Sequence, residues 1–182
     1  FVSAELAQAE ARAGWQEQAH RRMEELLASD PPLERHLAFF MHKELGMMKL
    51  RTNGVGEARS QLEWALARCS ADDAYESANL RMLQAGVAFA ERDPAAVDLY
   101  RNAAELAASL HLADLELDAR IGLVRSLLFA SRQREAGEQL LIAAKRCRAN
   151  GLGRRLGEIA ELAHSSSLPT SLVGEESHRP IS

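Results

Sequence analysis

Two stretches of the chain carry the same helical pattern, GEARSQLEWALARC at residues 56–69 and REAGEQLLIAAKRC at residues 134–147. A shift of 78 positions aligns seven identical pairs: Glu57/Glu135, Ala58/Ala136, Gln61/Gln139, Leu62/Leu140, Ala65/Ala143, Arg68/Arg146 and Cys69/Cys147. A shift of 78 positions equals two periods of about 39 residues. The spacing therefore predicts a chain built from helical units that recur along the sequence.

The composition favours helices over strands. The 182 residues are 47% apolar and 26% charged, which is enough to bury a core. Ala, Leu, Glu, Arg and Gln dominate, and these are good helix formers, whereas Val, Ile, Thr and Tyr are scarce. We therefore predict an all-α protein.

Charge and cysteine spacing exclude several classes of protein. The net charge of −4 argues against direct binding of nucleic acid, which usually requires a basic surplus. The two cysteines lie 78 residues apart without a CxxC motif, so neither a zinc site nor a disulfide framework is indicated. We also expect no cofactor and no metal. No stretch of 18 apolar residues occurs, so we expect no membrane-spanning helix.

The chain begins at Phe1 rather than Met and shows no signal peptide. From this start we expect a piece of a longer protein. From the cysteine usage we expect a cytoplasmic one.

Capping residues, prolines and glycines divide the helical pattern at regular intervals. The pattern predicts nine helices, which form four pairs and one terminal helix. They span Ala4–Arg12, Glu17–Ala28, Leu33–Arg51, Glu57–Cys69, 74–92, 94–110, Leu112–Ser131, Glu135–Ala149 and Arg154–Ala163. Connections of two to five residues imply that neighbouring helices are antiparallel.

A small residue recurs in the second helix of each pair. The anchors are Ala19, Ala58, Ala96 and Ala136, at intervals of 39, 38 and 40 residues. A larger residue follows four positions later (Met23, Leu62, Tyr100 and Leu140), and a leucine precedes each anchor by thirteen (Leu6, Leu45, Leu83 and Leu123). We expect the small residue to let two helix backbones approach closely where they cross.

This pattern resembles the tetratricopeptide repeat, with a leucine and a small residue in the first helix (Leu45-Gly46) and Ala-x3-large-x2-Ala in the second. The pattern in this chain departs from that repeat in two ways. Its period is near 39 residues, and the tryptophan expected early in the first helix is absent. The segment ARIGLVRSLLFASRQREAGEQLLIAAKRCRANGL is similar to repeats in the sensor domains of bacterial transcription activators of the maltose-regulon type.

The resemblance implies an α-solenoid of four antiparallel helix pairs with a C-terminal capping helix, over residues 1–164. Residues 165–182 are polar and aperiodic, and we expect a disordered tail or linker there. The alternative is an ordinary helical bundle of amphipathic Ala-Leu helices.

The resemblance also implies a concave groove lined by fixed positions of each first helix. The residues at these positions that we expect to bind a partner are Arg12, Phe40, Lys43, Met47, Arg51, Arg81, Phe89, Arg125 and Phe129. Ala78, Ala85 and Ile121 fall at equivalent positions. Because arginine grips carboxylates and phenylalanine anchors apolar side chains, we expect an acidic-hydrophobic peptide or helix as the partner. The alternative is that Phe89 and Phe129 face the core and the arginines are solvated.

We expect a non-enzymatic interaction or signal-sensing module of a larger regulator. HExxH, GxGxxG, GxxxxGK[ST] and GxSxG motifs do not occur in the sequence. The alternatives are a free-standing adaptor or chaperone and an unrecognised enzyme. The first repeat lacks an N-terminal cap, so its edge is a candidate for pairing in a homodimer.

Overall fold

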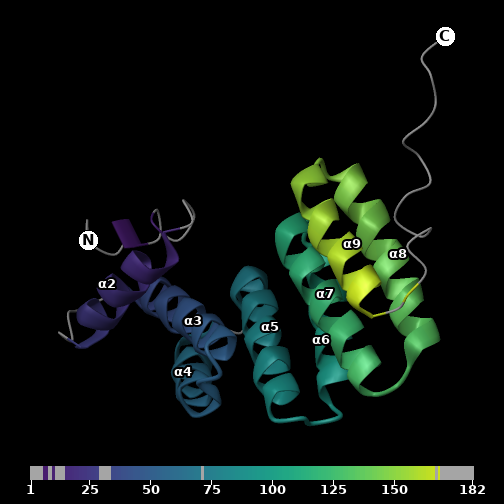
Figure 1. Cartoon of the computed structure of the whole chain (residues 1–182). Coiled ribbons are helices and arrows are strands. Elements are labelled where there is room, and N and C mark those ends of the chain that lie inside the picture. The colour runs from purple at the N-terminus through teal and green to yellow at the C-terminus, as the bar shows by residue number, and fades with distance from the viewer. Residues whose placement is uncertain are drawn as a thin grey trace. The chain divides into compact units, whose positions relative to one another are not determined.

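A computed structural model of the chain describes residues 6–7, 10, 15–28, 34–70, 72–166 and 168 (Figure 1). Within these residues the protein is all-α, as predicted. Eight α-helices and one short 3-10 helix follow one another: α2 (Gln16–Ala28), α3 (Arg35–Arg51), α4 (Val55–Arg68), α5 (Ala74–Ala90), α6 (Ala96–Ser109), α7 (Ala113–Phe129), α8 (Gln133–Ala149), η1 (Gly153–Arg155) and α9 (Leu156–Ser165). The first helix expected from the sequence lies mostly outside the described residues.

Three helices recur at a constant interval. Helices α3, α5 and α7 each contain 17 residues and begin at Arg35, Ala74 and Ala113, which are 39 positions apart. Just beyond each of them, a residue adopts a positive φ: Asn53 (63°), Arg92 (60°) and Ser131 (59°), again 39 positions apart. The same local turn therefore follows each of these helices.

The chain divides into two compact units, Phe1–Glu91 and Arg92–Ser182. In the first unit, α3 packs against α2, α4 and α5, and α4 also contacts α5. In the second, α7 packs between α6 and α8, and α9 covers α8. Sequential helices pair antiparallel, and contacts run from neighbour to neighbour, which is consistent with a helical-repeat arrangement.

The predicted anchor alanines are buried. Ala19, Ala58, Ala96 and Ala136 are at most 2% exposed. Ala65, Ala103 and Ala143, seven positions later, are fully buried. Of the four first-helix leucines, Leu45, Leu83 and Leu123 are at most 2% exposed, whereas Leu6 is 42% exposed.

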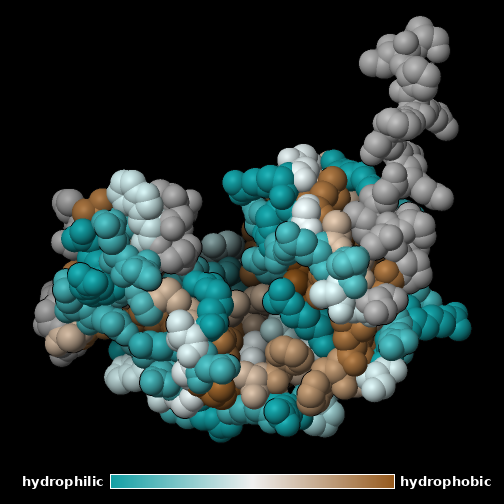
Figure 2. Space-filling model, in the orientation of Figure 1, coloured by the Kyte–Doolittle hydropathy of each residue, from teal (hydrophilic) through white to brown (hydrophobic). Residues whose placement is uncertain are grey.

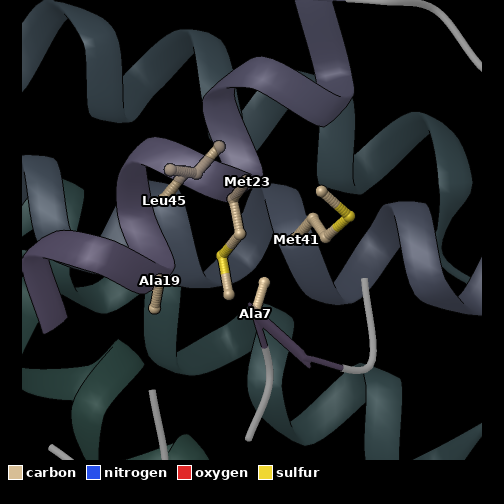
Figure 3. Close-up of a cluster of buried hydrophobic side chains, with 5 residues drawn as sticks. All are labelled: Ala7, Ala19, Met23, Met41 and Leu45. Carbon is tan, nitrogen blue, oxygen red and sulfur yellow. The ribbon is translucent and has the colours of Figure 1, made fainter. Parts of the chain in front are cut away.

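Two apolar clusters hold the first unit together. One joins α2 to α3 through Met23, Met41 and Leu45, with Ala7 and Ala19 beside them (Figure 3). The other joins α3, α4 and α5, and contains Phe39, Ala58, Ala65, Leu83 and Val87. Together the two clusters position α3 against α2, α4 and α5.

A glycine permits a close approach between two helices of the second unit. A methyl group on Gly122 of α7 would lie 2.5 Å from Cζ of Tyr100 on α6, well inside van der Waals contact. Tyr100 is 6% exposed, and burial raises its pKa to about 12. The tyrosine ring therefore lies directly on the α7 backbone, and no side chain fits between them.

Helix α9 ends at Ser165, and the chain packs back on it at Leu168, whose backbone N–H donates to the carbonyl of Ala163 at 3.0 Å. Leu168 is buried. The rest of the segment 165–182, predicted as a tail, lies outside the described residues apart from Ser166.

None of the helices in the described part of the chain has the length and apolar character needed to cross a bilayer. On the face shown in Figure 2, hydrophilic residues surround smaller hydrophobic patches.

We predict that Gly122→Ala destabilises the protein by about 1–3 kcal/mol, because the added methyl overpacks the contact with Tyr100. The measurement is the free energy of unfolding from urea denaturation. Gly157→Ala is the matched control, since no atom lies within 4 Å of the new methyl there. The control is expected to lose nothing and to gain at most about 1 kcal/mol from helix propensity. Equal effects at both glycines would refute the close contact.

Candidate binding pocket

A pocket of about 380 Å³ opens in the first unit, near the N-terminal ends of α3 and α5. Both helices begin here, and the residue before each helix also lines the pocket. The lining residues are Glu34, His36, Leu37, Phe39, Phe40, Lys43, Asp73, Tyr75, Glu76 and Asn79. The pocket therefore combines an apolar wall from α3 with a polar wall from the start of α5.

The apolar wall is held firmly. Phe39 is 2% exposed and belongs to the core cluster of α3, α4 and α5. Phe40 packs against the cluster of Met23 and Met41, and Nζ of Lys43 lies 5.7 Å from the centre of its ring. At the polar side, Tyr75 is 52% exposed. The apolar wall therefore presents the rings of Phe39 and Phe40, and the accessible ring of Tyr75 lies at the opposite side of the pocket.

A buried glutamate forms the centre of the polar wall. The side chain of Glu76 is 4% exposed. Its Oε2 accepts hydrogen bonds from the backbone N–H of Ser70 at 2.8 Å and from the guanidinium of Arg35 at 2.5 Å. Its Oε1 is buried and accepts no hydrogen bond within the described part of the chain. A buried carboxylate oxygen without a donor is energetically costly.

Local sequence explains why Glu76 stands there. Asp73 caps α5, and its Oδ1 accepts from the backbone N–H of Glu76 at 3.0 Å. Arg35 also donates to the carbonyl of Arg68 at 2.7 Å, so one guanidinium ties the end of α4 to the start of α5. The capping pair Asp73-x-x-Glu76 is visible in the sequence and was the signal that could have located this wall.

The predicted partner-binding residues of the first unit separate into three environments. Phe40 and Lys43 line the pocket. Met47 and Phe89 are half-buried, and Met47 packs against the cluster that contains Phe39. Arg51 and Arg81 are exposed.

In the second unit, Arg125 and Phe129 are exposed, the latter by 59%. Arg12 lies outside the described residues. The groove predicted across both units stays a prediction.

The predicted inner face needs one correction. Ala78 and Ala85 are fully buried and Ile121 is 4% exposed, so these three residues line no open groove. The reason is that α5 and α7 each pack against two other helices of their own unit, which leaves little of either surface open.

Beyond the pocket, one polar contact recurs between α3 and α4 and between α7 and α8. His42 is 6% exposed, and its Nδ1 lies 2.8 Å from Oε1 of Gln61. Seventy-eight positions later, Arg120 donates to Oε1 of Gln139 at 3.0 Å and to the buried Glu116 at 2.8 Å. The same glutamine position thus receives a different partner in each unit.

His42 also stacks on Trp64, with ring centres 5.5 Å apart and planes at 8°. Arg68 lies 4.3 Å from the ring of Trp64, which is 51% exposed. Burial lowers the pKa of His42 and the charge of Arg68 lowers it further, whereas the hydrogen bond with Gln61 raises it.

This environment predicts a pH effect on stability. Because the folded pKa of His42 lies below its ordinary value, the unfolded chain takes up the proton first as pH falls, and stability decreases below about pH 6.5. We expect His42→Gln to reduce that decrease between pH 7.5 and pH 5, measured as the free energy of unfolding. His36→Gln replaces an exposed histidine and is the control; identical pH slopes for both variants would contradict the assignment.

Comparison with protein-family models, curated proteins and solved structures finds no match for this chain. Across the described residues, no group of three or more His, Cys, Asp or Glu side chains is placed to hold a metal ion. The pocket combines an apolar wall with a buried carboxylate, a combination that is common in ligand-binding sites.

Proposed function

We propose that this chain is a non-catalytic interaction module that binds a segment of a partner protein. The pocket at the start of α3 and α5 holds one side chain of that segment. The observation that carries the proposal is the buried Glu76 beside an aromatic wall, since its Oε1 accepts no hydrogen bond from any described residue. Such a combination of apolar surface and a few oriented polar groups is typical of ligand sites.

The helix spacing supports a wider setting for the module. The constant 39-residue interval of α3, α5 and α7 favours a tetratricopeptide-like solenoid, in which stacked helix pairs present an extended binding surface. By the resemblance to sensor domains of maltose-regulon-type activators, the module would belong to a larger cytoplasmic regulator. The exposed Arg51, Arg81 and Arg125 are then candidates for contacts to acidic parts of the partner. A free-standing adaptor with the same pocket is the second candidate.

The test is selection of binding peptides from a random phage-displayed library on the full chain, followed by fluorescence anisotropy with each labelled peptide. We expect Tyr75→Ala to weaken binding by about fivefold or more, because an exposed aromatic ring at a pocket rim contributes about 1 kcal/mol or more. Tyr75 is suited to this test because its side chain is not part of the core clusters.

Two further variants make the result specific. Trp15→Ala removes another exposed aromatic outside the pocket and is expected to leave affinity unchanged. Phe129→Ala tests the predicted surface of the second unit. If Phe129→Ala weakens peptide binding and Tyr75→Ala does not, the binding site lies outside the pocket. If the library yields no binding peptide, the proposed function is contradicted.

A further inference from the structure

We infer that the pocket at the start of α3 and α5 selects a cationic group, an ammonium or a guanidinium, joined to an apolar group. This inference rests on the proposed function, because it names the chemistry of the ligand that the same pocket would hold. A cationic ligand has the opposite charge to the acidic-hydrophobic partner that was expected from the arginines and Lys43.

The charges that line the pocket are mostly negative. Three carboxylates (Glu34, Asp73 and Glu76) face one ammonium, that of Lys43. The ion-pair partners outside the lining do not change this balance. Arg35 pairs with Glu76, but Glu44 pairs with Lys43 at 2.6 Å, so one positive and one negative charge are added. The surplus of two negative charges favours a cation.

The helix ends reduce this surplus without removing it. Helices α3 and α5 both begin at the pocket, and each N-terminus carries roughly half a positive charge. Together they offset about one of the two carboxylate charges. A net negative field therefore remains where the aromatic wall and the polar wall meet.

Glu76 gives the cation a defined partner. Among the described residues, the donors to its carboxylate are Ser70 N–H and the Arg35 guanidinium; both bind Oε2, and none binds Oε1. A cation in the pocket is attracted to this carboxylate, and a ligand N–H would form a charge-assisted hydrogen bond with Oε1 once the side chain turns that oxygen toward the pocket. An anionic ligand would instead add a second negative charge beside a carboxylate that is 4% exposed.

The walls specify what the cation is attached to. Leu37, Phe39 and Phe40 offer hydrocarbon contact, and the exposed ring of Tyr75 offers a further cation–π surface. A lysine or arginine side chain of a partner protein and a free aromatic amine share this chemistry. The experiment has one arm for each source.

The test is a ¹H–¹⁵N chemical-shift titration of the full chain with 2-phenylethylammonium. Its counterpart is 3-phenylpropionate, which has the same ring and nearly the same length but the opposite charge. We expect the ammonium to shift the amides of Lys43, Tyr75 and Glu76 in a saturable manner, and the carboxylate to bind about tenfold more weakly or not at all. A peptide with the sequence Leu-Lys-Phe, acetylated and amidated at its ends, forms the second arm.

Glu76→Gln is expected to weaken binding of both cationic probes about tenfold, because it removes the charge and keeps the shape. Glu63→Gln neutralises an exposed glutamate that does not line the pocket and is the matched control. Because Glu76 also supports the fold through Arg35, Glu34→Gln at the exposed edge is a second variant, with a smaller loss of affinity expected.

The outcomes separate this inference from the function on which it rests. Stronger binding of 3-phenylpropionate, or equal affinity of Glu76→Gln and the parent protein for the ammonium, would overturn the cation preference. Selection of acidic peptides whose binding is weakened by Tyr75→Ala would also overturn the cation preference. The proposed function as an interaction module would be supported by the same result. Tighter binding of Leu-Lys-Phe than of the free amine would identify a protein side chain as the source of the cation.

Discussion

The structure depends on the close approach of helix backbones at small residues. Ala58 and Ala65 on α4 are fully buried where this helix meets α3 and α5, and Gly122 lets α7 lie directly under the ring of Tyr100. At these points the partner helix contributes a large side chain that fills the space beside the small one. A side chain larger than alanine would push the helices apart, and the core clusters and the pocket wall formed by Phe39 would lose their alignment.

Polar contacts then restrict how the paired helices slide along each other. The His42–Gln61 contact links α3 to α4, and the Arg120–Gln139 hydrogen bond links α7 to α8 at the equivalent place. Each forms only in one register, and a shift by one turn would leave a buried polar group without its partner. The small residues set the distance between helices and the polar pairs set their register. In the first unit α3 also packs against α5, and the N-terminal ends of these two helices meet where the pocket lies.

Much of the fold was predictable because helix periodicity and capping are local properties of a sequence. The anchor alanines and the 39-residue interval were visible in it, and the helices that contain them were predicted to within a few residues at most ends. The departures have physical causes. Helix α6 begins at Ala96 rather than at Pro94, because the side chain of Asp93 accepts a hydrogen bond from the N–H of Ala95 and forms a turn first.

The pocket was only partly predictable, for a different reason. Phe40 and Lys43 were identified from their positions on the first helix of a pair, but the carboxylates that define the polar wall come from the capping turn of the next helix. Burial of Glu76 depends on Arg35, which lies 41 positions earlier, and no local pattern connects the two. Likewise, Ala78 and Ala85 were expected on an open face, but a helix that contacts two neighbours buries positions that a single pair would leave exposed.

Amide hydrogen exchange of the second unit tests the packing account most directly. Helix α7 lies between α6 and α8, whereas α9 packs mainly against α8, so neighbour-to-neighbour packing predicts that the amides of α7 exchange more slowly than those of α9. The central amides of α7, around Gly122, are expected to be the most protected in residues 96–166. Exchange of α7 as fast as that of α9 would show that α7 is not held between two helices, and would contradict the account.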